Sequence, residues 1–246
     1  MYSKQQTLSP VAGANKNKFL LAAAVSAAAL SLQTASALPL NGGFETGDFT
    51  GWTVSIPTGV SQTMGTIPAG SAGVFSSWGP FTGMASALTA PDGNYFAAIG
   101  SADYGFFYSA QTYNISARQT FSLHAGDVLT GLAAFYNGDY EAQDMARVRI
   151  FDADNNQAAT PWYWVSGGDT YRTVTPWDTW QWQAPANGNF TVDIGVTTQG
   201  DDRFASYGLF DSVGVSTVVP VPEPSEMVLI GMGVVCLAAF NRRPGK

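Results

Sequence analysis

The middle of the sequence consists of short runs of β-branched and aromatic residues, and this pattern restricts the possible fold more than any other feature. Turn-forming residues separate the runs, and no stretch shows the long 3.6-residue apolar period of an amphipathic helix. The runs are residues 52–56, 95–99, 119–123, 128–136, 146–151, 190–197 and 209–215. The pattern predicts an all-β domain, an antiparallel β-sandwich of the jelly-roll type.

The sequence also indicates how some of these strands are oriented and joined. In residues 146–151, valine and isoleucine alternate with Arg147 and Arg149, so one face is expected to be apolar and the other to face water. The acidic segment 152–156 is interpreted as a hairpin turn, because it lacks the glycine and the terminal glutamate of an EF-hand loop. Residues 55–89, rich in Gly, Ser, Thr and Pro, are expected to form a long excursion at one end of the sandwich.

The first 37 residues are organised like a secretory signal peptide. Lys16 and Lys18 precede the apolar stretch 19–32, and the small residues Ala-Ser-Ala at 35–37 provide a cleavage site. An uncleaved transmembrane anchor is the alternative. Cleavage predicts a mature chain that begins at Leu38 and a β-sandwich domain over residues 38–217.

The C-terminal segment 218–246 is organised like a membrane anchor. A proline-rich spacer leads into residues 227–240, which are all apolar or glycine, and basic residues follow. Because this run has no polar face, it predicts a transmembrane helix whose basic end stays in the cytoplasm. The alternative is a buried C-terminal helix of a soluble domain, since apolar runs of 10 to 14 residues often have that role.

In the order and spacing of its parts, this tail resembles the PEP-CTERM sorting signal of bacteria that make extracellular polysaccharide. The resemblance covers residues 221–246. It implies that a membrane protease-transferase, the exosortase, recognises the Pro-Glu-Pro motif and cuts nearby. The chain would then pass from the membrane to the cell surface or the extracellular matrix. The motif residues are Val221, Pro222, Glu223, Pro224, Arg242 and Arg243.

The charge of residues 38–217 argues against a nucleic-acid partner. This region has no lysine, five arginines and sixteen acidic residues, which gives a net charge of about −11. Such a domain repels phosphates. The single cysteine, Cys236, lies in the predicted anchor, so the exported domain is expected to have no disulfide and to depend on its apolar core.

Two further segments carry a second resemblance. Residues 41–45 (Asn-Gly-Gly-Phe-Glu) and 51–54 resemble the opening of galactose-binding-like and carbohydrate-binding jelly rolls, and residues 207–215 resemble their closing strand. The resemblance implies that Glu45 and Asp211 come together and hold a structural calcium ion, which takes six to eight oxygen ligands. Alternatively, both are ordinary polar residues at a sheet edge.

Aromatic residues between 162 and 182 are the candidate ligand surface. Five of the seven tryptophans lie there: Trp162, Trp164, Trp177, Trp180 and Trp182. Sugar rings present flat C–H faces that pack on exposed aromatic rings. Strand alternation places Trp162 with Trp164 on one face, and Trp180 with Trp182 on one face.

These aromatic residues are not expected to share one role. Trp180 and Trp182 are favoured as core residues, because a sandwich without disulfides needs large side chains inside. The candidate glycan contacts are Tyr171, Trp177, Trp162 and Trp164, with Tyr171 and Trp177 in or beside a predicted loop. Three or more of the five tryptophans exposed on one face would favour glycan binding, and none exposed would favour a structural role.

Catalysis has little support in the sequence. The only histidine, His124, precedes a turn and is expected to be solvated. No serine or cysteine nucleophile motif accompanies it, and there is no second histidine to complete a metal site. The carboxylates leave a glycosidase pair open, but no sequence feature marks one.

Together these features predict a non-catalytic, exported protein of the bacterial cell surface or biofilm matrix that associates with extracellular polysaccharide. Two alternatives stay open. A structural matrix protein would self-associate, bury its tryptophans and show no affinity for sugars. A surface glycoside hydrolase would use a carboxylate pair.

Overall fold

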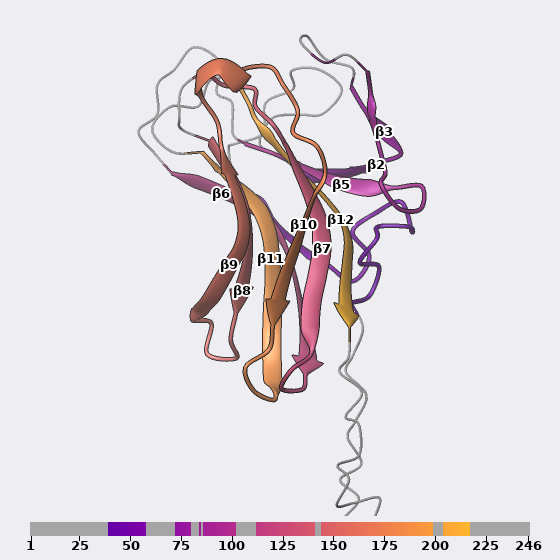
Figure 1. The fold of residues 1–246 in the computed structure, drawn as a ribbon, viewed down its shortest axis with the longest axis vertical. Coiled ribbons are helices and arrows are strands. Elements are labelled where there is room, and N and C mark those ends of the chain that lie inside the picture. Colours follow the sequence, from indigo (N-terminus) through magenta and orange to yellow (C-terminus); the bar gives the residue numbers. More distant parts are fainter. Residues whose placement is uncertain are drawn as a thin grey trace, which may run out of the picture. The chain divides into compact units, whose positions relative to one another are not determined.

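Two antiparallel sheets account for most of the described chain (Figure 1). The computed structural model describes residues 39–57, 72–79, 84, 86–101, 112–140, 144–198 and 204–216. Within these residues, one five-stranded sheet has the order β1-β6-β11-β8-β9 and the other has the order β10-β7-β12-β5-β2. This arrangement confirms the prediction of an all-β sandwich.

The strands have the following bounds. The first sheet contains, in spatial order, β1 (Thr53–Ser55), β6 (Tyr113–Leu123), β11 (Gly188–Thr198), β8 (Asp144–Phe151) and β9 (Gln157–Val165). The second contains β10 (Asp178–Gln183), β7 (Val128–Tyr136), β12 (Tyr207–Ser216), β5 (Phe96–Gly100) and β2 (Ala72–Phe75). A separate hairpin pairs β3 (Ser77–Trp78) with β4 (Leu88–Thr89), and a short 3₁₀ helix, η1, covers Gly168–Thr170.

The main core lies between the two sheets because successive side chains of each strand point to opposite faces. Val148 and Ile150 of β8 are fully buried, as the alternation of this strand predicts. Trp162 of the first sheet packs edge-on against Phe210 of the second, with ring centroids 6.1 Å apart. Apolar contacts of this kind hold the sandwich together.

The prediction that the other face of β8 is open to water is wrong for Arg147. Its exposed fraction is only 7%, and Arg149 is half-buried. The neighbouring strand β11 places Asp193 and Thr197 beside these arginines, and the polar side chains cover one another. Alternation within one strand predicts the direction of a side chain, but its exposure also depends on the strands on either side.

The expected excursion over residues 55–89 contributes strands within its described part. β2 pairs with β5 and forms an edge of the second sheet. The hairpin of β3 and β4 places Trp78 in a second, smaller core cluster, where its ring lies 5.0 Å from that of Tyr136. The excursion therefore extends the sandwich.

The Asn-Gly-Gly-Phe-Glu segment forms a series of turns that packs on β12. Asn41 donates from Nδ2 to the carbonyl of Asp48 (2.9 Å), and the ring of Phe44 stacks on Trp52 with centroids 5.4 Å apart. A Cβ built on Gly42 would lie 1.9 Å from the carbonyl oxygen of Val213, so this position requires glycine. The motif thus has a structural explanation.

The acidic segment after β8 forms a hairpin turn, as predicted. The Asp152 carboxylate accepts hydrogen bonds from the backbone N–H groups of Asp154 (3.0 Å) and Asn156 (2.8 Å). Asn155 adopts a left-handed conformation with φ of 61°, which asparagine tolerates better than most residues. The carboxylate is therefore used inside the turn.

Several predictions concern parts of the chain outside the described residues. These are the signal peptide (1–37), the sorting segment (218–246) with its helix (227–240), and Cys236. Among the described residues, no helix has the length and apolar character needed to cross a membrane. The domain boundaries at 38 and 217 stay predictions.

Candidate functional site

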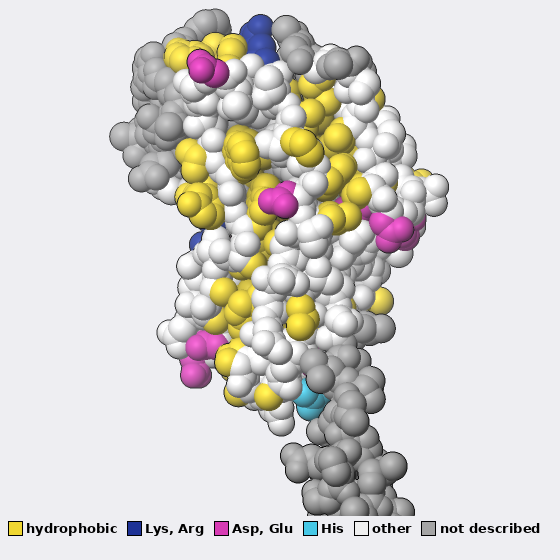
Figure 2. Space-filling view, viewed as in Figure 1, with side chains coloured by type: hydrophobic (Ala, Val, Ile, Leu, Met, Phe, Trp, Pro, Cys, Tyr) yellow, Lys and Arg dark blue, Asp and Glu magenta, His cyan; other side chains and the backbone are white. Residues whose placement is uncertain are grey.

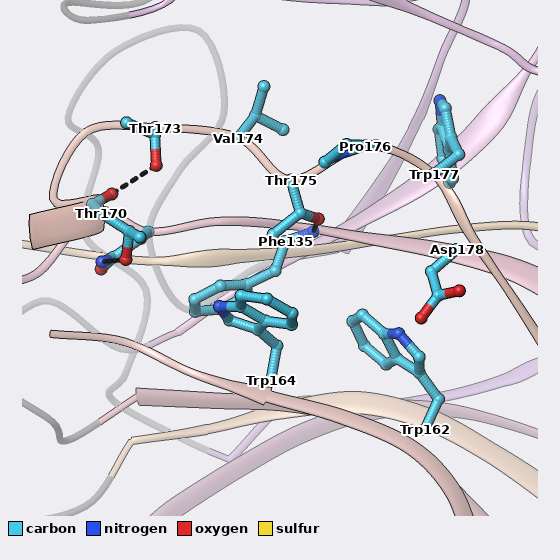
Figure 3. A pocket seen from close by; sticks show the side chains of 11 residues that line it. Phe135, Trp162, Trp164, Thr170, Thr173, Val174, Thr175, Pro176, Trp177 and Asp178 are labelled. Carbon is cyan, nitrogen blue, oxygen red and sulfur yellow. Dashed lines mark hydrogen bonds between the residues drawn. The ribbon is translucent and has the colours of Figure 1, made fainter.

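A cavity of about 420 Å³ opens where the edge strands β9 and β10 of the two sheets lie next to each other. Figure 2 shows that hydrophobic side chains gather on this side of the molecule. In Figure 3, Trp162 and Trp164 of β9 lie on one side of the cavity, and the segment from Thr170 to Asp178 lies on the other. Small-molecule sites commonly have volumes of about 300 to 1,000 Å³.

A bulge in β9 precedes the two tryptophans. Trp162 lies opposite Val148, whereas Ala159 lies opposite Ile150, so Thr160 and Pro161 together face a single β8 residue. Proline lacks a backbone donor and is tolerated at such a bulge in an edge strand. After the bulge, Trp162 and Trp164 point to the same side and both line the cavity, as alternation predicts.

The two tryptophans contribute differently. Trp162 has an exposed fraction of 6% and forms the inner part of the cavity, whereas Trp164 has an exposed fraction of 40% and lies nearer to solvent. Tyr163, between them in sequence, points to the other face of the sheet and is 61% exposed. Trp164 is therefore the tryptophan of β9 that a ligand reaches first.

The opposite wall is held by hydrogen bonds to β7. Thr175 donates its backbone N–H to the carbonyl of Phe135 and accepts from the N–H of Phe135 through Oγ1, both at 2.9 Å. Asn137 accepts from the N–H of Arg172 (2.7 Å) through its carbonyl and donates from Nδ2 to Thr170 Oγ1 (2.9 Å). These bonds fix the wall before any ligand arrives.

Trp177 lies at the rim of the cavity, and its ring points away from Trp162 and Trp164 (Figure 3). The ring is half-buried and packs edge-on against Phe96, with centroids 5.6 Å apart. The carboxylate of Asp178 points toward the ring of Trp162 (Figure 3). The cavity thus combines aromatic faces with a carboxylate and the hydroxyl groups of Thr170 and Thr173.

The carboxylates of the lining bear on the hydrolase alternative. Among the described residues that line the cavity, Asp178 is the sole carboxylate. A glycosidase of the common type needs two carboxylates about 5 to 9 Å apart. Aromatic faces with a few polar groups are typical of small-molecule sites in general.

Sequence reasoning missed Asn137 and Thr175, whose hydrogen bonds position the wall. Asn137 begins an Asn-Gly-Asp turn signal directly after a predicted strand. That signal predicts a turn, but the Asn137 amide bonds to the 166–173 segment, 30 or more residues further along the chain. No local pattern encodes such a contact.

Tyr171 does not line the cavity. Its ring packs edge-on against Tyr140 (5.8 Å) and Phe204 (6.4 Å), and the guanidinium of Arg172 lies 4.9 Å above it. Tyr140 and Phe204 are exposed, so this aromatic group lies at the surface. The structure therefore separates Tyr171 from Trp177, although the sequence places both in or beside one loop.

The remaining two tryptophans lie in or against the core, as expected. Trp180 has an exposed fraction of 2%, and the half-buried Trp182 packs against Phe190 with centroids 5.0 Å apart. Of the five clustered tryptophans, Trp164 alone is exposed. One exposed tryptophan is fewer than the three that would favour glycan binding and more than the none that would favour a structural role.

The predicted calcium ligands Glu45 and Asp211 lie close together. Gly43 is next to both, since its Cβ would be 3.7 Å from Asp211 Oδ1 and 3.8 Å from Glu45 Cγ. Asp211 is fully buried; the N–H of Ser212 donates to Oδ1 (2.6 Å), and Oδ2 has no hydrogen-bond partner. Burial raises the pKa of Asp211 to about 7, and the Asp92 and Glu45 carboxylates contribute to the increase.

The Glu45 carboxylate binds backbone N–H groups of the loop that precedes β5. Its carboxylate accepts from the N–H groups of Asn94 (2.9 and 3.0 Å) and Tyr95 (3.0 Å), and these hydrogen bonds lower its pKa. No group of three or more His, Cys, Asp or Glu side chains that could hold a metal occurs in the described part of the chain. A calcium ion would therefore depend on two carboxylates and backbone carbonyls. The buried Oδ2 of Asp211 fits such a ligand.

His124 lies in the turn between β6 and β7. Asp127 Oδ2 accepts from the backbone N–H of His124 (2.8 Å) and lies 3.6 Å from its Nδ1. The Asp127 carboxylate thus contacts both the backbone and the ring of His124 within this turn. This geometry explains the position of the histidine without assigning it a reaction.

No protein-family model and no curated protein matches the chain. Among solved structures, TmCBM61 in complex with β-1,4-galactotriose aligns with 17% identity over 74% of this chain and 100% of that chain, at a TM-score of 0.43. The K3 cleaved adhesin domain of Lys-gingipain from Porphyromonas gingivalis aligns with 22% identity over 75% and 100%, at 0.43. A CBM4 structure aligns with 15% identity over 72% and 98%, at 0.34. At these values the similarities assign neither a family nor a ligand.

Proposed function

We propose that this domain binds saccharide without catalysis, through the cavity between β9 and β10. The observation that carries the proposal is that Trp162 and Trp164 both point into one cavity of about 420 Å³, with Trp177 at its rim. Trp164 offers an accessible ring face for the C–H surface of a sugar. The threonine hydroxyls and Asp178 supply hydrogen-bond partners for sugar hydroxyls at the rim.

The proposal includes export of the chain and its sorting by an exosortase to the cell surface or biofilm matrix. Its support is the sequence of residues 1–37 and 218–246, which are organised as a signal peptide and a PEP-CTERM signal. In this setting the ligand is an extracellular polysaccharide. A binding domain released into such a matrix would attach the protein to it.

A structural calcium ion at Glu45 and Asp211 is part of the same proposal. Its support is the buried Asp211 Oδ2, which has no hydrogen-bond partner and would gain a cation as a ligand. The ion would stabilise the contact between the N-terminal loop and β12. It would have no role in saccharide chemistry.

The binding proposal is tested by affinity electrophoresis in gels that contain soluble neutral polysaccharides: a galactan, a glucan, a xylan, a mannan and the organism's own matrix polysaccharide. At least one should retard the protein. Trp164→Ala should weaken that retardation about tenfold or more, as loss of a central aromatic contact does, and Trp177→Ala should weaken it less, because that ring packs on Phe96 at the rim.

Tyr171→Ala is the matched control, because Tyr171 is an aromatic residue of the same segment whose ring lies outside the cavity. Its retardation should equal that of the unchanged protein. Equal losses in all three variants would contradict the assignment to the cavity. No retardation by any polysaccharide, together with association that depends on protein concentration, would favour a self-assembling matrix protein instead.

A further inference from the structure

Positive charge is concentrated on the outer face of the β1-β6-β11-β8-β9 sheet. Three of the four arginines in the described residues, Arg118, Arg147 and Arg149, lie there on β6 and β8. Val148 and Ile150, which alternate with the β8 arginines, are in the core, so the arginines point away from it. Few basic side chains are visible on the face with the tryptophan cavity (Figure 2).

A single buried carboxylate, Asp193 of β11, lies among the three arginines. It is directly opposite Arg118 on one neighbouring strand and Arg149 on the other. Arg118 Nε donates to Asp193 Oδ2, and Arg149 Nη2 donates to Oδ1 at 3.0 Å. Both carboxylate oxygens are therefore occupied by protein partners.

Arg147 has no carboxylate partner within the described residues. Its guanidinium reaches across β11 and donates to the neutral side chains of Thr197 and Asn114. Gly195, which lies opposite Arg147 in β11, has no side chain to obstruct this path. Burial lowers the pKa of Arg147 to about 10, and the nearby Arg149 and Arg118 contribute to the decrease.

Among the described residues of this face, three guanidinium groups and one carboxylate give a net charge of +2, in a chain whose net charge is −7. Partly buried like charges repel each other strongly, and an ion network that served only stability would be expected to balance them. A bound anion would relieve the repulsion. Two parallel N–H groups of a guanidinium match a carboxylate.

Arg118 is the arginine with free capacity to bind such an anion. About 36% of its side chain is exposed, and within the described residues its guanidinium forms a hydrogen bond through Nε alone. The ring of Phe151, whose centroid lies 4.8 Å from the guanidinium carbon, and the carboxylate of Asp193 hold the group in place. Tyr163, opposite Arg147 in β9, adds an aromatic ring to the same face with 61% exposure.

We propose that this arginine face is a second binding site, specific for the carboxylate groups of an acidic polysaccharide built from uronic acids. Arg118 would bind a sugar carboxylate, and Tyr163, three strands away on β9, would pack on a ring further along the same polysaccharide. The choice of a polysaccharide over a small anion rests on the proposed saccharide-binding function. The site is separate from the tryptophan cavity, since Tyr163 and Trp164 point to opposite faces of β9.

The test uses polygalacturonate and alginate as acidic probes and fully methyl-esterified polygalacturonate as the matched neutral probe. The full domain should bind at least one acidic probe, bind the ester at least tenfold more weakly, and lose affinity for the acidic probe as salt increases. Arg118→Gln should weaken binding of the acidic probe about tenfold, because one charge-assisted pair is lost. Arg172→Gln, the same change elsewhere on the domain, should have no effect.

Arg118→Gln leaves Asp193 paired with Arg149, so the variant is expected to fold, and Tyr163→Ala provides a second variant if it does not. In the unchanged protein, the Nε–H NMR signals of Arg118 and Arg149 should shift on addition of a galacturonate oligosaccharide.

Equal binding of acid and ester, no binding of either acidic probe, or unchanged affinity in Arg118→Gln would overturn the proposal. If Trp164→Ala abolishes binding of neutral and acidic probes alike, the arginine site is refuted while the tryptophan cavity stands. Loss of neutral binding alone in Trp164→Ala, with acidic binding retained, would support two sites.

Discussion

The ring of Trp180 lies directly against Gly131, its partner across the β10–β7 pair. A Cβ built on Gly131 would be 2.5 Å from Trp180 Cζ2 and 2.7 Å from Cε2, closer than real Cβ atoms approach. The glycine thus makes room for a tryptophan that is 2% exposed and has no hydrogen-bond partner for its buried Nε1. Trp180 therefore contributes to the core through the close packing of its ring on β7.

Gly131→Ala should therefore destabilise the domain, by about 1 to 3 kcal/mol, which is the usual cost of overpacking a core. Urea denaturation followed by tryptophan fluorescence measures the change. Gly188→Ala is the matched control, because its Cβ would meet Phe190 at 3.5 Å, an ordinary contact distance. If Gly131→Ala were as stable as Gly188→Ala, the close packing of Trp180 on β7 would be refuted.

Asp144 gives the domain a pH-dependent stability. This residue of β8 is fully buried and accepts hydrogen bonds from Ser101 Oγ (2.8 Å), Thr198 Oγ1 (3.0 Å) and the N–H of Ser206 (3.0 Å). Burial raises the pKa of Asp144 to about 7 despite these bonds, and the nearby Asp139 adds to the increase. The folded state therefore binds a proton that the unfolded state releases near pH 4.

Because the folded pKa is above the unfolded one, this contribution to stability is complete below about pH 4 and is lost as the pH rises to about 7. Asp144→Asn should reduce the decline in unfolding free energy between pH 4.5 and 8 by on the order of a few kcal/mol. Asp152→Asn should leave the decline unchanged, since hydrogen bonds from Asn156 lower the pKa of that exposed carboxylate. An identical decline in Asp144→Asn and the unchanged protein would refute the assignment.

Sequence and structure agree where information is local and differ where it depends on neighbouring strands. The alternation of Val148 and Ile150 predicts their burial, and the Asp152 turn follows from its composition. By contrast, the burial of Arg147 depends on Asn114 and Thr197, which lie on β6 and β11. A strand reveals its two faces in its own sequence, but its partners are decided by the packing of the whole domain.

The candidate site shows the same division. Trp162 and Trp164 share a side because they are two residues apart in a strand, which the sequence predicts. Trp177 and Tyr171 diverge because the first packs on Phe96 and the second on Tyr140, contacts with residues far away in the sequence. The cavity exists because β9 and β10 are edges of different sheets, a relationship that no local pattern specifies.

Calcium provides a test of the Glu45–Asp211 pair. A bound cation favours the ionised form of Asp211, so calcium should stabilise the domain more at pH 8 than at pH 5, where the buried carboxyl is protonated. At a hundredfold excess over its Kd, calcium should add about 2.7 kcal/mol, measured as a higher Tm in calcium chloride than in EDTA. Asp211→Asn should remove this increase, and Asp144→Asn should retain it. Equal Tm values in calcium and EDTA at pH 8 would exclude the ion.

The export and sorting of the protein can be tested by measuring the mass of the protein recovered from the cell exterior. Removal of the signal peptide predicts an N-terminus at Leu38, and exosortase cleavage near the Pro-Glu-Pro motif predicts loss of residues after about 224. Replacing Pro222 and Pro224 by alanine should leave a full-length C-terminus in the membrane fraction, because the enzyme loses its recognition motif while the apolar run is unchanged. Trp164→Ala, a change in the saccharide cavity, should be processed normally. Extracellular protein that retained Lys246 would contradict sorting by cleavage, and the tail would then act as a permanent anchor or as part of a folded domain.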